Sequence, residues 1–220
     1  MIAEPRDRWR APDAGTAYAT TRWKNRTREQ RDPRLVARLL RRLPESVLPR
    51  GARVLDVPCG TGRLHAVLAG RGLRVTSADV SPAMLAAHEA GRGHALCADA
   101  GRLPFDDGTF ELVLCCRLLH HLRDEAELRR IVAELVRVSR GHVIASFWDR
   151  ASLPELGRGS RPRGEEVPRG RIARARRDLR AAFEDAGAGV VAHAASLRFV
   201  SRQTFLLASV APDAGGRARA

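Results

Sequence analysis

Five short apolar segments alternate with segments of helical spacing between residues 53 and 147. The apolar segments predict strands at residues 53–57, 74–78, 94–98, 110–116 and 142–147. The intervening spacing predicts helices at residues 62–70, 82–90 and 124–139. Strands joined by helices run in parallel, because each crossover returns the chain to the same edge of the sheet. The alternation therefore predicts an α/β fold with a doubly wound sheet.

Further elements are expected on both sides of this alternation. Apolar residues recur at helical spacing from Leu35 to Leu43, which predicts a helix capped by Asp32 with Pro33 at its first position. Towards the C-terminus the pattern predicts a long Gly-, Pro- and Arg-rich loop at 149–170, a basic helix at 171–186, and strands at 190–200 and 204–210. We expect a flexible arm at 1–32, one folded domain at 33–211 and a disordered tail at 212–220.

The charge of the chain lies mainly at its two ends. The net charge is +14, and basic and acidic residues number 13 and 6 in residues 1–50, 13 and 12 in 51–150, and 13 and 7 in 151–220. The densest basic run comprises the arginines at 158, 161, 163, 169, 171, 174, 176, 177 and 180. One hypothesis is an anionic acceptor, carrier, surface or RNA bound at these ends. The alternative is a solvated surface of biased composition, since Lys24 is the only lysine.

The cysteines and the first residues bear on the cellular compartment. Residues 1–10 are charged rather than apolar, which is unlike a secretory signal, and no apolar run approaches the roughly 18 residues of a membrane span. The four cysteines, Cys59, Cys97, Cys115 and Cys116, form no CxxC pair that would suggest a metal site. We expect reduced thiols in a cytoplasmic protein, with Cys115 and Cys116 pointing to opposite faces of the sheet.

A glycine-rich turn follows the first predicted strand, in the segment Asp56-Val57-Pro58-Cys59-Gly60-Thr61-Gly62. Such a turn lets the backbone approach a ligand closely, at the sheet edge where α/β proteins bind ligands. Asp79 ends the second strand, where a carboxylate can accept hydrogen bonds from two ribose hydroxyls. Asp99 ends the third strand, where a polar side chain can contact an adenine edge. A turn followed by acids at two successive strand ends is more specific than the turn alone.

Four segments together resemble the class I S-adenosylmethionine (SAM)-dependent methyltransferases, particularly the small-molecule group that includes the ubiquinone-biosynthesis enzymes. They are VLDVPCGTGRL (residues 54–64), SADVSPAML (77–85), CADAGRLPFDDGTFELVLC (97–115) and RLLHHL (117–122). The resemblance implies a Rossmann-like fold with a seven-stranded sheet in the order 3-2-1-4-5-7-6. The sheet would be mostly parallel, with an antiparallel C-terminal hairpin and helices on both faces.

The resemblance also implies where the cofactor SAM would bind. Asp56 would neighbour the methionine amino group, Asp79 would hold the ribose, and Asp99 would accept from the adenine amino group. The other implied cofactor contacts are Pro58, Cys59, Gly60, Thr61, Gly62, Val80, Met84, Ala100, Cys116 and Arg117. No metal is expected. Pro58 stands where many relatives have the first glycine, which disfavours NAD because a pyrophosphate needs a close glycine turn.

Two other sets of residues are candidates for catalysis and for acceptor binding. His120 and His121 follow the fourth strand, and either imidazole could act as a general base or shape the site. Tyr18, Trp23 and Arg26 precede the first helix, in a segment that would build the acceptor pocket or form a surface arm. A cysteine nucleophile is disfavoured, since no Pro-Cys pair follows the fourth strand.

The interpretation that follows is methyl transfer to O, N or C of a small or lipid-like acceptor, releasing S-adenosylhomocysteine (SAH). Alternatives are an RNA or protein methyltransferase, a non-catalytic SAM-binding module, and an NAD-dependent oxidoreductase. The first lacks an Asn-Pro-Pro-Tyr motif, since Cys116-Arg117-Leu118-Leu119 occupies its place. The sequence leaves the acceptor and the oligomeric state open.

Overall fold

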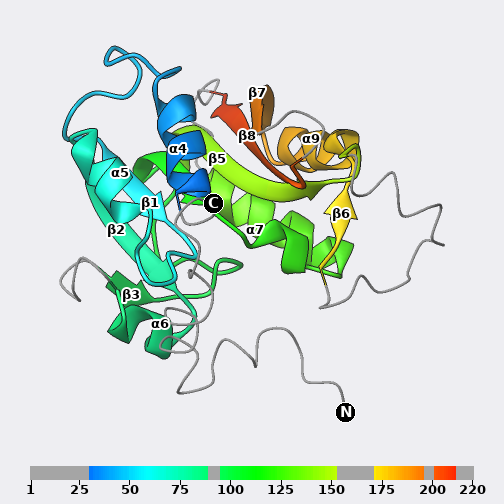
Figure 1. Cartoon of the computed structure of the whole chain (residues 1–220), viewed down its shortest axis with the longest axis horizontal. Coiled ribbons are helices and arrows are strands. Elements are labelled where there is room, and N and C mark those ends of the chain that lie inside the picture. The colour runs from blue at the N-terminus through cyan, green and yellow to red at the C-terminus, as the bar shows by residue number, and fades with distance from the viewer. Residues whose placement is uncertain (1–29, 89–94, 153–170, 196–200, 212–220) are drawn as a thin grey trace, which may run out of the picture.

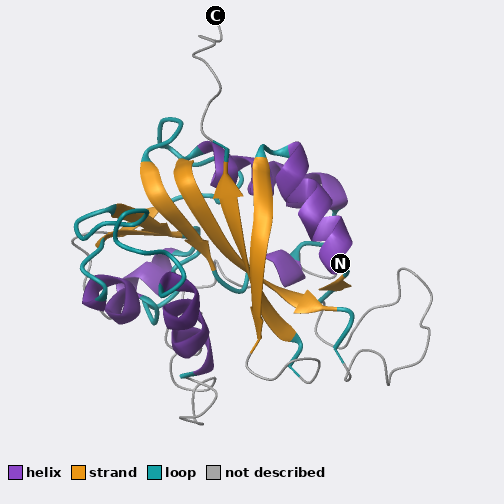
Figure 2. Cartoon of the chain, turned by 90° about the horizontal axis from the view of Figure 1, so that it is seen from above, coloured by secondary structure: helices purple, strands orange, loops and turns teal. Residues whose placement is uncertain are grey.

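A single sheet with helices on both faces organises the chain (Figures 1 and 2). The structure is a computed structural model that describes residues 30–88, 95–152, 171–195 and 201–211. Its strands are β1 (Arg53–Asp56), β2 (Arg74–Asp79), β3 (Ala95–Cys97), β4 (Phe110–Cys115), β5 (Ser139–Asp149), β6 (Ala173–Arg174), β7 (Ala188–Ala195) and β8 (Gln203–Val210). Its helices are α4 (Arg31–Leu40), α5 (His65–Gly70), α6 (Pro82–Ala86), the 3-10 turn η2 (Leu119–His121), α7 (Glu125–Arg137) and α9 (Arg176–Asp185).

The strand order is β3-β2-β1-β4-β5-β8-β7, which confirms the predicted order of the seven main strands. The first five of these run parallel, and β8 is antiparallel to both β5 and β7. An eighth strand, β6, pairs with the end of β5 beside this path and was not predicted. The doubly wound sheet predicted from the alternation and the Rossmann-like order implied by the resemblance are therefore both confirmed.

Alternate residues along the central strands point to two separate apolar layers. On one face, Val113, Cys115 and Val143 pack with the apolar sides of α7 and α9. On the other face, Leu114 and Cys116 pack with α4 and α5. Adjacent Cys115 and Cys116 thus belong to opposite layers, as predicted from the period of a strand. Because β1 to β5 run parallel, their carboxyl ends lie at one common edge of the sheet.

Several predicted boundaries were wrong, and the start of α4 matters most for the site. The helix begins at Arg31 with Gln30 as its N-cap residue, so Asp32 does not cap it and Pro33 is its third residue. The carboxylate of Asp32 instead takes part in buried ion pairs. Propensity rules recognise an acid beside a helix start but carry no information on a partner that is distant in sequence.

The remaining differences are shifts of element ends. Helix α5 begins three residues later than predicted, and α6 ends at Ala86. Helix α9 begins at Arg176 instead of Arg171, because residues 173–174 pair with β5 as the strand β6. Strand β5 extends the predicted strand at both ends. The arm was expected at 1–32, but residues 31–32 begin α4. The rest of the arm before residue 30, most of the Gly-rich loop and the expected tail lie outside the described residues, so those predictions stay open.

Candidate functional site

The turn after β1 is tied to the end of β2 by backbone hydrogen bonds. The Cys59 amide donates to the Ala78 carbonyl at 2.9 Å, and the Gly60 amide donates to Oδ2 of Asp79 at 2.8 Å. Gly60 has a φ of 57° and Gly62 a φ of 82°, in the left-handed region that favours glycine. The glycines thus let the chain reverse closely enough for one strand end to contact the next.

Gly62 also has no room for a side chain, because the His88 ring packs against it. A Cβ atom built on Gly62 would lie 2.6 Å from Cε1 of the His88 ring, whose Nε2 lies 3.1 Å from the Ser77 hydroxyl. A Cβ atom built on Gly60 would meet nothing within 4 Å. The backbone is therefore equally unusual at both glycines, whereas only Gly62 is enclosed.

We expect Gly62→Ala to lower the free energy of unfolding by about 3 kcal/mol, through the strained φ and the overlap with His88 together. Gly60→Ala is the matched control and should cost only about 1 kcal/mol, since it adds the backbone strain alone. Urea unfolding of the ligand-free variants measures both values. Equal losses would show that His88 moves aside at no cost.

Asp56, the last residue of β1, carries the most unusual carboxylate in the described part of the chain. The residue is 1% exposed, and within the described residues neither of its carboxylate oxygens has a hydrogen-bond partner. Burial raises the pKa of Asp56 to about 8, with a smaller rise from Asp79, while the Arg63 guanidinium lowers it. A buried acid without a donor needs a cation or a hydrogen-bond donor beside it to ionise at neutral pH.

Asp79 ends β2 beside this turn and is both bonded and buried. Its Oδ2 accepts from the Gly60 amide, and its Oδ1 accepts from the Ser81 amide at 2.9 Å. Burial raises the pKa of Asp79, and these backbone donors oppose the rise. An ionised carboxylate has about four acceptor sites, so it can serve these two amides and further donors.

The residues implied for adenine lie around the ends of β2 and β3. Asp79 pairs in register with Cys97 of β3, so Asp99 follows at the same edge of the sheet. Oδ1 of Asp99 accepts from the Gly101 amide at 2.8 Å. Met84 of α6 and Ala100 are buried, and Val80 is half-buried. The predicted cofactor contacts at the ends of β1, β2 and β3 thus lie along one edge of the sheet.

The tip of β4 is held in an unusual backbone conformation. Arg117 has a φ of 66°, the only positive value at a non-glycine residue in the described part of the chain. Its amide donates to the Ser146 hydroxyl at 2.7 Å, and that oxygen also accepts from Nε2 of Gln203 at 2.8 Å. Strain of this kind persists only where surrounding contacts fix it, and it often marks functional sites. Ser146 and Gln203 were not predicted.

The thiols near this edge are poor nucleophiles. Burial raises the pKa of Cys116 to about 12, and burial also raises the pKa of Cys59. Both groups are therefore neutral thiols at physiological pH. This agrees with the sequence argument against a cysteine nucleophile.

Asp32 brings two arginines together behind the tip of β4. Its Oδ2 accepts from Nε of Arg117 at 2.6 Å and from Nη2 of Arg63 at 3.1 Å. The Asp32 side chain is fully buried, and the arginine side chains are 22% and 10% exposed. No sequence signal marks this triad, because its members are 31 and 85 residues apart and match no motif.

The two histidines differ in their surroundings. His120 is buried and its ring stacks on Trp148, with centroids 5.3 Å apart and planes 13° apart. His121 is half-buried and its ring centroid lies 4.4 Å from that of His120. The guanidinium carbons of Arg171 and Arg202 lie 5.2 and 5.5 Å from the centroid of the Trp148 ring. Trp148 therefore links the histidine pair to two cations, and the sequence pattern did not identify it.

Most of the candidate site residues lie in a segment that matches a known protein family. Residues 55–145 match the family described as a methyltransferase domain. This segment is similar to the SAM-dependent methyltransferases, which supports that cofactor for the chain. The match extends from β1 into the middle of β5 and includes the acids of β1, β2 and β3. The match therefore favours SAM over NAD as the cofactor.

Enzymes of named activity are similar to about half of this chain over part of their own length. A demethylmenaquinone methyltransferase of Clavibacter sepedonicus is 35% identical over 119 residues, which cover 50% of this chain and 46% of that protein. A malonyl-[acyl-carrier protein] O-methyltransferase of Serratia marcescens is 33% identical over 111 residues, covering 49% and 42%. The chain thus spans less than half the length of these relatives.

A solved structure is similar over nearly all of the chain. Magnesium protoporphyrin IX methyltransferase from Synechocystis PCC 6803, crystallised with SAH, has a TM-score of 0.67 and 20% identity. The similarity covers 89% of this chain and 97% of that chain. At this identity the likeness establishes the shared fold alone.

Other predicted residues lie elsewhere or outside the described ranges. Tyr18, Trp23 and Arg26 are outside them, as are the arginines at 158, 161, 163 and 169 of the basic run. Arg174 pairs with Glu125 at 2.8 Å, and Arg176 pairs with Asp149 at 2.6 Å. Part of the predicted basic run is therefore neutralised by acidic residues of α7 and of β5.

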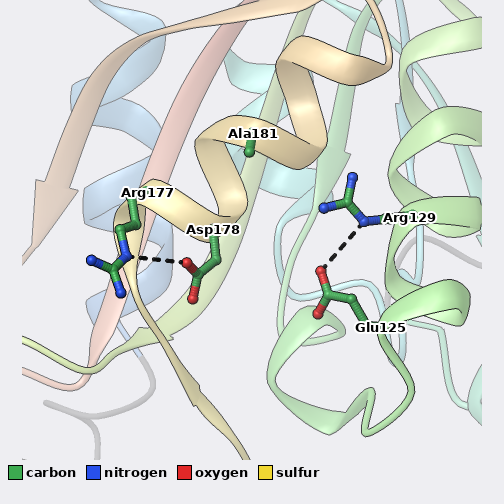
Figure 3. A pocket seen from close by; sticks show the side chains of 5 residues that line it. All are labelled: Glu125, Arg129, Arg177, Asp178 and Ala181. Atoms are coloured by element: carbon green, nitrogen blue, oxygen red, sulfur yellow. Dashed lines mark hydrogen bonds and ion pairs between the residues drawn. The ribbon is translucent and has the colours of Figure 1, made fainter.

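A charged hollow between α7 and α9 is separate from the predicted cofactor contacts. It is lined by Glu125, Arg129, Arg177, Asp178 and Ala181 (Figure 3). Arg129 pairs with Glu125 at 3.7 Å, and Arg177 with Asp178 at 3.4 Å. Exposed pairs of this kind contribute little free energy, and none of the predicted site residues lines the hollow. Among the described helices, none is long and apolar enough to cross a membrane.

Proposed function

We propose that the protein transfers the methyl group of SAM to a nucleophilic O, N or C atom of a small or lipid-like acceptor and releases SAH. The observation that carries this proposal is that Asp56 and Asp79, which end the neighbouring strands β1 and β2 beside the glycine-rich turn, are both buried at one sheet edge. The names of the similar proteins support a small acceptor, since they act on demethylmenaquinone and on malonyl groups of a carrier protein.

The residues fit the proposed cofactor on structural grounds. Within the described residues the carboxylate oxygens of Asp56 have no hydrogen-bond donor, and the methionine end of SAM carries an ammonium group that could supply one. A Cβ atom built on Gly60 would have no other atom within 4 Å, so a ligand can approach the backbone there. Asp79 keeps acceptor sites for the ribose hydroxyls beyond its two backbone bonds.

The proposed roles of the other contacts follow from their places around this edge. Val80 and Met84 pack on the adenine, Asp99 accepts from its amino group, and Ala100 lies beside it. Cys116 and Arg117 border the sulfur from the tip of β4. The turn residues Pro58, Cys59, Thr61 and Gly62 line the methionine and ribose side.

Bound SAM would supply a methyl group on a positively charged sulfur, which is a good leaving group. The protein's main task is then alignment, because holding two reactants in place contributes about 7–11 kcal/mol to catalysis. His120 is stacked on Trp148, so we assign it a positioning role. His121 is less enclosed and is the better candidate for a base that accepts an acceptor proton.

The test is to follow a labelled methyl group from SAM into separate pools of metabolites, RNA and protein. We expect label in the organic-extractable or small-molecule fraction, and none with Asp79→Ala protein as the matched control. Label in RNA or protein would favour the alternative that uses the basic ends. SAH binding by calorimetry without transfer to any pool would favour a non-catalytic module.

A further inference from the structure

Asp32 has no role in the family motif, yet it occupies a central place behind the site. It is fully buried near the start of α4, an element outside the family match. Its Oδ2 accepts from both Arg63 and Arg117, and within the described residues its Oδ1 has no hydrogen-bond partner. An ion pair this deeply buried is costly unless its geometry is good, so its presence needs a reason beyond stability.

The two arginines come from separate loops that both end at the cofactor edge. Arg63 directly follows the glycine-rich turn, and Arg117 lies just beyond the end of β4. Arg117 is fixed at both ends, because its amide bonds Ser146 while its side chain bonds Asp32. Its positive φ shows that these contacts outweigh the backbone preference of a non-glycine residue. The structure thus holds this guanidinium in one position.

The charges of the cluster complement those of an amino acid. Among the described residues the two guanidinium groups share the carboxylate of Asp32, which relieves the repulsion between the two cations. Beside this cluster lies Asp56, whose carboxylate interacts with Arg63 and lacks a donor among the described residues. A guanidinium has five N–H donors and can serve more than one acceptor. The two arginines can therefore bind a carboxylate group, while the neighbouring Asp56 can bind an ammonium group.

We propose that Asp32 is a positioning residue that holds Arg63 and Arg117 for the carboxylate of the cofactor's methionine moiety. This inference rests on the proposed function. Asp32 itself does not touch the cofactor, and it acts by fixing the two guanidinium groups that do.

The test compares two ligands that differ only at the amino-acid end. SAH carries the carboxylate and ammonium groups, and 5′-methylthioadenosine has the same adenosine and a thioether but neither charged group. We expect Asp32→Asn to weaken SAH binding about tenfold or more in calorimetry, as for a lost charge-assisted contact. Binding of 5′-methylthioadenosine should be unchanged.

Controls separate this role from a merely structural one. Glu111→Gln is matched, because Glu111 is also a carboxylate shared by two arginines, Arg53 and Arg140, but lies at the start of β4. It should leave the affinities for both ligands unchanged. If Asp32→Asn protein does not fold, Arg63→Gln should show the same selective loss of SAH.

Two outcomes would overturn the inference, and they differ from failure of the proposed function. Equal weakening of both ligands would mean that Asp32 only supports the fold. Unchanged SAH binding would mean that the arginines need no positioning, or make no contact with the carboxylate. Absence of SAH binding by the folded wild-type protein would instead overturn the proposed function itself.

Discussion

Asp79→Ala is expected to lower the affinity for SAH at least about 100-fold. Two ribose hydroxyls would lose a charged acceptor, and each hydrogen bond to a charged group is worth about 1.5–3 kcal/mol. The same substitution also removes the acceptor of the Gly60 and Ser81 amides, so the turn loses its tie to β2. Calorimetric titration of wild-type and variant protein with SAH measures the difference.

Asp99→Ala provides the graded control for this experiment. Asp99 is proposed to accept a single hydrogen bond from adenine, so its loss should weaken SAH binding by about tenfold. Thermal unfolding of each ligand-free variant monitors the fold separately. Similar affinities for wild-type and Asp79→Ala protein would show that this acid does not hold the ribose.

The affinity for SAH is expected to rise about 100-fold between pH 5.5 and pH 7.5. In the ligand-free protein Asp56 has a pKa of about 8, so it is mostly protonated in this range. The cationic amino group favours the ionised form, which lowers the pKa in the complex and releases one proton on binding. Affinity therefore increases about tenfold for each pH unit below 8.

Proton release is measured directly by titration in buffers of different ionisation enthalpy. Asp56→Asn should abolish most of the pH dependence, because an amide does not titrate in this range. The pKa of Asp79 is also raised, so binding of 5′-methylthioadenosine reports the part of the slope that belongs to the ribose. A wild-type slope retained by Asp56→Asn protein would assign the proton to another group.

The same pKa has a consequence for the stability of the ligand-free protein. The unfolded chain loses the Asp56 proton near its ordinary pKa of 3.8, whereas the folded chain keeps it up to about pH 8. The unfolded state therefore binds fewer protons across this window, and the contribution of Asp56 to folding stability falls as the pH rises through it. SAH or SAM should restore this loss by supplying the cation.

The order of strands and helices and the glycine-rich turn with its neighbouring acids could be predicted from the sequence. Apolar runs and helical spacing are local properties, so they located the strands from β1 to β5 and the three acids at their ends. Helix ends were less certain, as at α9, where pairing of residues 173–174 with β5 overrode the helical pattern. That pairing is a tertiary contact, which a local pattern cannot encode.

The supporting residues of the site could not be predicted for the same reason. Asp32 was interpreted as a helix cap, which is the common use of such a residue, but its actual partners are Arg63 and Arg117. Ser146 and Trp148 lie in an apolar strand, where nothing distinguishes a polar or aromatic residue that faces the site. Only the assembled sheet brings these side chains to the tip of β4.

The hydrogen bond between Gln203 and Ser146 means that the tip of β4 is fully supported only once β8 has joined the sheet. Gln203 begins β8, which inserts between β5 and β7 and is the last of the described strands along the chain. During synthesis, the family-matched segment therefore emerges before the amide that fixes Ser146 and, through it, Arg117. A nascent chain would present the glycine-rich turn early and acquire a rigid β4 tip only when β8 has docked. The cofactor would therefore bind tightly only after β8 has docked. By binding only the completed sheet, it would also stabilise the docked C-terminal hairpin.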